Sequence, residues 1–82
     1  MPFVYILHSP EFDRYYIGSC GNMEERLEKH NSGATKSTRP FRPWVLVYQE
    51  CFDTSTQARK RENQIKSYKG GEAFKQIFNK PR

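Results

Sequence analysis

The sequence predicts a small α/β (α+β) domain, a three-stranded and mostly antiparallel sheet flanked by helices in the order β-β-α-β-α-α. Three observations favour this class: three short runs of β-branched and aromatic residues, three stretches with helical spacing of apolar residues, and no repeats or linkers between them. The 82 residues are expected to form one domain, residues 1–82. A chain of this length buries only about 60% of its unfolded surface, so its core is small.

The first two strands are predicted to pair as a hairpin. The run "FVYILH" (3–8) ends at "SPEFDR", whose Ser, Pro and Asp are typical of a turn, and "RYYIG" (14–18) follows directly. The third strand, "WVLVYQECF" (44–52), is apolar enough that we expect both of its faces to be covered.

The first helix is predicted to follow the hairpin. Asn22 is a suitable N-cap, and Glu25 three residues later places an acid in the first turn. The helix should run to about Ser32 and end at Gly33, because glycine readily adopts the left-handed conformation of a helix end.

Two further helices are predicted after the third strand. N-cap candidates at 53–55 begin a helix that is expected to end at the glycine pair 70–71. A short last helix, "EAFKQIFNK", would turn three apolar residues inward: Phe74, Ile77 and Phe78.

The charge of the chain favours a polyanionic partner. Net charge is +5, and residues 57–82 contain eight basic residues and only two acids. Lys36, Arg39 and Arg42 form a second basic run without any acid. Clustered positive charge is expected of a phosphate-binding surface, with a merely solvated surface as the alternative.

Two cysteines do not make a disulfide framework, so we expect Cys20 and Cys51 to be reduced core residues in a cytoplasmic protein. The N-terminus lacks the basic region and long apolar run of a signal peptide, and no membrane-spanning segment is expected. A zinc site with His8 and His30 is disfavoured, because the cysteines lack the usual C-x-x-C spacing.

Two predicted helices place charged residues on their apolar stripes. Met23 and Leu27 share a stripe with Arg26 and His30, and Glu62 lies between the apolar residues of the second helix. Charged residues are rarely buried unless they are paired. Either a salt bridge between Arg26 and Glu62 ties the helices together, or these side chains project into a shared pocket at the sheet surface.

The strands and this charged set together resemble the GIY-YIG nuclease family. The segments "FVY" (3–5) and "YIG" (16–18) contain tyrosines eleven positions apart, and Arg26, His30 and Glu62 match the family's arginine, histidine and glutamate in order. The segments "HNSG", "PW-LVY-E" and "AR-RE-QIKS" are similar to the small stand-alone bacterial members, which are related to the N-terminal nuclease domain of the nucleotide-excision-repair incision subunit.

The resemblance implies a divalent-metal-dependent endonuclease that hydrolyses phosphodiester bonds of DNA, with RNA as the alternative. Arg26 would bind phosphate oxygens through its planar guanidinium, and Glu62 would hold a Mg²⁺ or Mn²⁺ that keeps most of its waters. Tyr5 is expected to activate the water and Tyr16 to position the phosphate, although the two roles could be reversed. An unperturbed phenol is a weak base at neutral pH, so His30, Arg26 or the metal must assist.

The chain departs from the family pattern at several positions. Phe3 replaces the first glycine of the family name, and Ser19 stands where some members have a lysine. Asn79 is a candidate for an asparagine that contributes late in the chain of some members.

The predicted substrate contacts are basic residues that would bind the nucleic-acid backbone without reading sequence: Lys36, Arg39, Arg42, Arg59, Lys66 and Lys69. Low specificity, a role in DNA repair, and a homodimer or a recruiting protein partner are further expectations. The alternatives are a nucleic-acid-binding module that has lost catalysis, and a basic protein–protein adaptor on the same scaffold.

Overall fold

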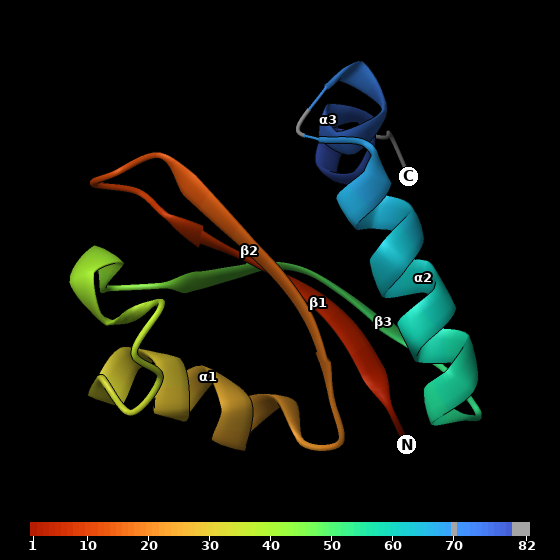
Figure 1. Cartoon of the computed structure of the whole chain (residues 1–82), viewed down its shortest axis with the longest axis horizontal. Coiled ribbons are helices and arrows are strands. Elements are labelled where there is room, and N and C mark those ends of the chain that lie inside the picture. Colours follow the sequence, from red (N-terminus) through yellow and green to blue (C-terminus); the bar gives the residue numbers. More distant parts are fainter. Residues whose placement is uncertain (70, 80–82) are drawn as a thin grey trace.

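The predicted order of elements is confirmed in a computed structural model, which describes residues 1–69 and 71–79, the side chains of 78 and 79 excepted. The three strands form one antiparallel sheet in the order β2-β1-β3 (Figure 1). A short 3₁₀ helix, η1, which the sequence did not predict, lies in the loop before the third strand. The elements are β1 Phe3–Ser9, β2 Arg14–Cys20, α1 Met23–Ser32, η1 Arg39–Phe41, β3 Val45–Cys51, α2 Ser55–Ser67 and α3 Glu72–Asn79.

The helices cover opposite faces of the sheet, with α1 on one side and α2 and α3 on the other (Figure 1). Side chains alternate between the faces of a strand, so β1 contributes to both cores. Val4 and Ile6 pack with Ala58, Ile65 and Phe74 beneath α2 and α3. On the other face, the α1 core contains four buried residues: Tyr5, Leu7, Met23 and Trp44. The central strand therefore holds both layers together.

The caps of α1 follow the sequence prediction. The Asn22 side chain accepts a hydrogen bond from the backbone N–H of Glu25 at 3.0 Å, and Gly33 ends the helix in the left-handed region at φ 86°. In α2 the N-cap is Thr54, within the predicted range. That helix ends at Ser67, earlier than the predicted glycine pair, because Lys69 already turns left-handed at φ 53°.

The expectation that both faces of the third strand are covered is wrong. Exposure alternates along β3, and Val45 and Val47 remain 48% and 39% exposed. The physical reason is position, because β3 lies at the edge of the sheet and α2 packs mainly against β1 and β2.

Both cysteines are free, but Cys51 is exposed, so the expectation that both fill the core is wrong for Cys51.

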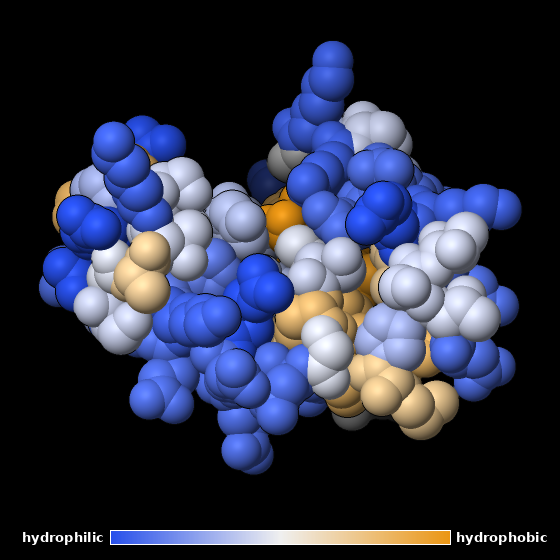
Figure 2. Space-filling model, turned by 60° about the horizontal axis from the view of Figure 1, so that its bottom comes forward, coloured by the Kyte–Doolittle hydropathy of each residue, from blue (hydrophilic) through white to orange (hydrophobic). Residues whose placement is uncertain are grey.

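Phe74 and Ile77 of α3 face the core as predicted, while the side chain of Phe78 lies outside the described residues. Hydrophilic side chains dominate the surface over α1 (Figure 2). Among the described residues, every helix is too short or too polar to cross a bilayer.

The hairpin places Tyr5 directly opposite Gly18, and this pairing requires glycine. An added Cβ at Gly18 would lie 2.6 Å from the Tyr5 Oη and 2.8 Å from its Cζ, closer than side-chain contacts allow. The Tyr5 ring therefore uses the space that a side chain at position 18 would fill, which explains the glycine of the "YIG" segment.

Gly18→Ala is therefore expected to lower the free energy of unfolding by about 1–3 kcal/mol, because the new methyl group forces the Tyr5 ring aside. Gly21→Ala is the matched control, since nothing lies within 4 Å of its added Cβ. Urea denaturation of both variants measures the difference. Equal stability of the two variants would contradict the packing argument.

Candidate active site at the edge of the sheet

A buried hydrogen-bond chain joins the central strand to α1 and the following loop. The Tyr5 hydroxyl lies 3.1 Å from His30 Nε2, and His30 Nδ1 lies 2.9 Å from Thr38 Oγ1. All three residues are nearly inaccessible, with exposed fractions of 1%, 1% and 2%. The inward histidine of the α1 stripe therefore has a partner on each ring nitrogen.

The direction of each bond follows from the number of available protons. Thr38 Oγ1 donates its single proton to the carbonyl of Thr35 at 3.3 Å, so it accepts from His30. His30 is then protonated on Nδ1 and bare on Nε2, and the Tyr5 hydroxyl donates to that bare nitrogen. The geometry thus places a proton acceptor directly behind a phenol.

The pKa shifts of this pair agree with that assignment. Burial lowers the pKa of His30, and the nearby positive charge of Arg26 lowers it further, so the imidazole is neutral at pH 7. Burial and the neighbouring Tyr16 raise the pKa of the Tyr5 hydroxyl, while Arg26 opposes them. A free Tyr5 phenolate is therefore not populated at neutral pH, and His30 Nε2 is the proton acceptor to which the phenol is hydrogen-bonded.

Tyr16 lies on the same face and is more open to solvent. Its ring centroid is 4.8 Å from that of His30 and 6.2 Å from that of Tyr5, so the three rings form one cluster. Tyr16 is half-buried, whereas Tyr5 is almost completely buried. The two predicted tyrosines are thus brought together but differ in access.

The loop that carries Thr38 is anchored by Trp44. The indole N–H donates to the carbonyl of Thr38 at 2.9 Å. The side chain of Asn31 pairs with both backbone groups of Trp44, at 2.6 and 3.0 Å. Sequence reasoning missed Thr38, because a threonine in a polar loop gives no local signal of a buried contact.

Arg26 projects from α1 beside the end of β2. It lines a depression of about 180 Å³ together with Cys20, Gly21, Asn22, Glu25 and Lys29. Its charge acts on both Tyr5 and His30, which places it within electrostatic reach of the buried pair.

Glu62 approaches β2 from the opposite face of the sheet, on α2. Its Oε1 accepts from the Ser19 hydroxyl at 2.8 Å, and its Oε2 accepts from the Lys66 ammonium at 2.7 Å. Burial disfavours the carboxylate, but the hydrogen bonds from Lys66 and Ser19 and the nearby charge of Arg59 outweigh it and lower the pKa of Glu62. The group is therefore ionised at neutral pH.

Both alternatives drawn from the helical stripes need correction. Glu62 pairs with Ser19 and Lys66, so the salt bridge to Arg26 is not formed. Arg26, His30 and Glu62 also do not lie on one side of the sheet, since α1 and α2 cover opposite faces (Figure 1). They instead approach the outer strand β2 from two sides, and the charges of both Arg26 and Glu62 still act on Tyr5.

The donor set around Glu62 suits a weakly held hard cation. Among the described residues, no group of three or more His, Cys, Asp or Glu side chains could hold a metal. A single ionised carboxylate fits Mg²⁺ or Mn²⁺, which keep several waters and take further oxygens from substrate phosphates. Glu62 is the residue that would hold such an ion.

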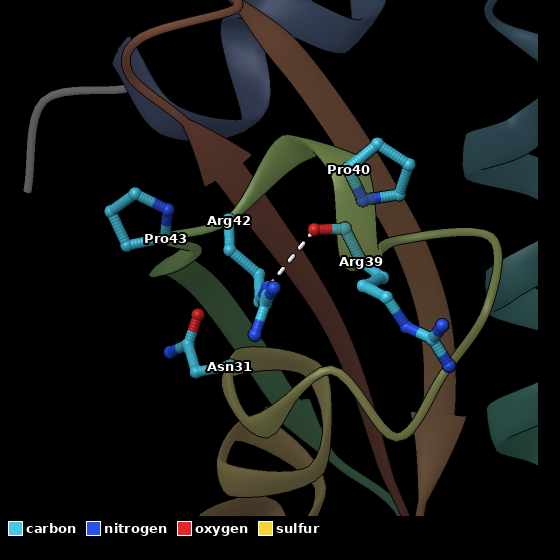
Figure 3. A pocket seen from close by; sticks show the side chains of 5 residues that line it. All are labelled: Asn31, Arg39, Pro40, Arg42 and Pro43. Atoms are coloured by element: carbon cyan, nitrogen blue, oxygen red, sulfur yellow. Dashed lines mark hydrogen bonds between the residues drawn. The ribbon is translucent and has the colours of Figure 1, made fainter.

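The basic loop residues lie at the other end of α1. Arg39 and Arg42 line a depression of about 670 Å³ with Asn31, Pro40 and Pro43 (Figure 3). Each arginine is held by its Nε: Arg39 donates to the carbonyl of Gly33 at 2.7 Å, and Arg42 donates to that of Arg39 at 2.9 Å. Both arginines are exposed, and Lys36 is exposed in the same loop.

The remaining candidates lie on α2 or outside the described part. Arg59, Lys66 and Lys69 are exposed on α2 or just beyond its end, on the other side of the sheet from the loop arginines. Arg59 lines a third depression of about 600 Å³ that also contains Ser19, Cys20 and Gly21. The side chain of Asn79 is outside the described residues.

Comparisons with known proteins agree with the resemblance. A family model described as the GIY-YIG catalytic domain matches residues 1–74. A UPF0213 protein of Staphylococcus haemolyticus is 38% identical over 76 residues, which cover 92% of each chain. One of Staphylococcus saprophyticus is 44% identical over 63 residues, 76% of this chain and 77% of that protein. The solution NMR structure of a UPF0213 protein of Bacillus halodurans has 30% identity and a TM-score of 0.48 over 90% of this chain and 92% of that one.

The lowered pKa of His30 predicts a loss of stability in mild acid. Between the folded pKa and the unfolded value of about 6.5, the unfolded chain binds more protons, so stability falls as pH is lowered through that window. Denaturant unfolding from pH 7.5 to 5.5 is expected to show this fall, at no more than about 1.4 kcal/mol per pH unit.

His30→Gln should remove that slope, whereas His8→Gln, at the only other histidine, should retain it. A wild-type slope matching that of His30→Gln would show that the buried histidine is not the titrating group.

Proposed function

Because the chain belongs to the GIY-YIG catalytic domain family, we propose that it is a divalent-metal-dependent endonuclease that hydrolyses phosphodiester bonds of DNA. Low sequence specificity, a cytoplasmic location and a role in DNA repair belong to the same proposal. The observation that carries it is the hydrogen bond from the Tyr5 hydroxyl to the neutral His30 Nε2, since it pairs a weak acid with a proton acceptor beside an arginine.

Tyr5 and His30 are proposed to activate water as a relay. As the water oxygen attacks phosphorus, its proton passes to the Tyr5 oxygen while the Tyr5 proton passes to His30 Nε2. The bond from phosphorus to the leaving oxygen breaks, and that oxygen takes a proton from solvent. This route avoids a free phenolate, which the raised pKa of Tyr5 disfavours.

Tyr16 is assigned the positioning of the phosphate because its half-buried ring is the more accessible of the two. Its ring also lies against His30, so a phosphate bound there would be near the relay. The competing assignment reverses the tyrosines, and the 1% exposure of Tyr5 is the observation that favours it.

Arg26 and Glu62 are proposed to stabilise charge from the two sides of β2. The Arg26 guanidinium would bind the phosphoryl oxygens, which gain negative charge in the transition state. A Mg²⁺ or Mn²⁺ held by Glu62 would, when bound, supply positive charge beside the leaving oxygen. Ser19 keeps the Glu62 carboxylate turned toward β2.

Basic residues on both sides of the sheet are proposed to hold the substrate backbone. Arg39 and Arg42 present fixed guanidinium groups, and Lys36 adds a mobile ammonium in the same loop. On the α2 side, Arg59, Lys66 and Lys69 would act on the same backbone. Contacts to phosphate give affinity without sequence preference, and a single site cuts one strand.

A second candidate function is nucleic-acid binding without catalysis. It is favoured by one observation, that both oxygens of the only proposed metal ligand are already engaged. The cleavage experiment below separates the two candidates.

Plasmid nicking with Mg²⁺ or Mn²⁺ tests the endonuclease proposal. Glu62→Gln and Arg26→Met should each slow nicking by about 10²–10³-fold, because each removes a charge that stabilises the transition state. Tyr5→Phe should slow it by about 10²-fold or more, since the relay loses its central proton. Tyr15→Phe, on the same strand as Tyr16 but outside the proposed site, should retain the wild-type rate.

Nicking by Tyr5→Phe at the wild-type rate, with loss in Tyr16→Phe, would reverse the two tyrosines. If wild type nicks plasmid no faster than Glu62→Gln but still binds DNA, the endonuclease proposal is wrong and the nucleic-acid-binding function remains.

The salt dependence of duplex binding tests the backbone contacts. Arg39→Met should weaken binding and reduce the slope of log K against log salt by about 1, because one phosphate contact is lost. Lys75→Met, which removes an exposed charge on α3, should leave the slope unchanged. Equal slopes for wild type and Arg39→Met would exclude Arg39 as a phosphate contact.

A further inference from the structure

The carboxylate of Glu62 is already paired with a cation from its own helix. Lys66 lies one turn later on α2, and its ammonium is 2.7 Å from Glu62 Oε2. The other oxygen, Oε1, accepts from Ser19 on β2. Each carboxylate oxygen therefore has a partner that holds it in place.

The two partners differ in how firmly they are held. Ser19 is part of β2, so its backbone is fixed by the sheet, and its short side chain binds Oε1 of Glu62. The Lys66 side chain is 51% exposed, against 15% for Glu62, and its long stem can turn into solvent. Oε2 is consequently the oxygen that can be released at low cost.

A divalent ion at Glu62 must take the oxygen that Lys66 now occupies. The ion and the ammonium are both positive, so they compete for Oε2 and repel each other at contact distance. The hydroxyl of Ser19 is neutral and can keep its bond to Oε1 while the ion binds.

We propose that Lys66 is a positioning residue that occupies the cation position on Glu62 Oε2 and leaves it when the divalent ion binds. This inference rests on the proposed function, in which Glu62 is the metal ligand. In the resting protein the ammonium holds the mostly buried carboxylate in its orientation without a metal. The same contact lowers the affinity for the metal.

The expected magnitude is modest because the pair is partly exposed. Exposed ion pairs are weak, and removal of a positive charge beside a divalent ion adds to the gain, so the affinity for metal should rise roughly three- to tenfold. An ordinary pair that only stabilises α2 would change the melting temperature but not this affinity.

The experiment is a titration of the full chain with Mn²⁺ in the absence of nucleic acid, followed by the electron paramagnetic resonance signal of free Mn²⁺. Lys66→Met should bind Mn²⁺ roughly three- to tenfold more tightly than wild type. Lys66→Arg, which keeps a cation at the same position, should bind like wild type. Lys60→Met removes the same charge from an exposed position on α2 and should also bind like wild type.

The outcomes separate this inference from the proposed function. If wild type binds Mn²⁺, Glu62→Gln loses it, and Lys66→Met binds no more tightly than Lys60→Met, Lys66 does not compete with the metal and only this inference fails. If Glu62→Gln binds Mn²⁺ as well as wild type, Glu62 is not the metal ligand and both fail. If no variant binds Mn²⁺, including Lys66→Met, removal of the ammonium does not open a cation position and only this inference fails. Circular dichroism melting of each variant shows whether a lost affinity reflects a lost fold.

Discussion

The hydrogen bond between Tyr5 and His30 is the interaction on which the α1 side of the molecule depends. It joins the central strand to α1 inside a core that excludes water, where an unpaired hydroxyl or imidazole would cost about 1–3 kcal/mol. This hydrogen bond restricts which residues are tolerated at two other positions. Position 18 must have no side chain, because the phenol fills that space, and Thr38 must accept the proton that His30 carries on Nδ1. A loop of irregular sequence is therefore as constrained as the strands.

Side chains from two helices approach the edge strand β2, although the helices pack on opposite faces of the sheet. Arg26 reaches it from α1 and Glu62 from α2, and the turn at Cys20 and Gly21 borders a depression on each side. An edge strand suits this arrangement, since no further strand blocks access from the side. A small domain can in this way assemble opposite charges around one strand without burying them against each other.

The Glu62 carboxylate is held by one neutral partner, Ser19, and one oppositely charged partner, Lys66. Ser19 and Lys66 keep Glu62 ionised despite its burial, and the charge of Arg26 helps to keep His30 neutral. Ser19 orients the carboxylate through a hydrogen bond and adds no charge of its own.

The sequence by itself determined the order of the strands and α-helices, the caps at Asn22 and Gly33, and the residue types of the candidate site apart from Thr38, because periodicity, capping and residue type are local properties. Only the tertiary structure decided which faces of the sheet the helices cover, that alternate residues of β3 stay exposed, and that Glu62 binds Ser19 and Lys66 instead of Arg26. These depend on packing between segments far apart in the chain. Helical periodicity predicts that a residue points inward. It does not identify the face of the sheet on which the helix packs or the residue that the side chain will contact.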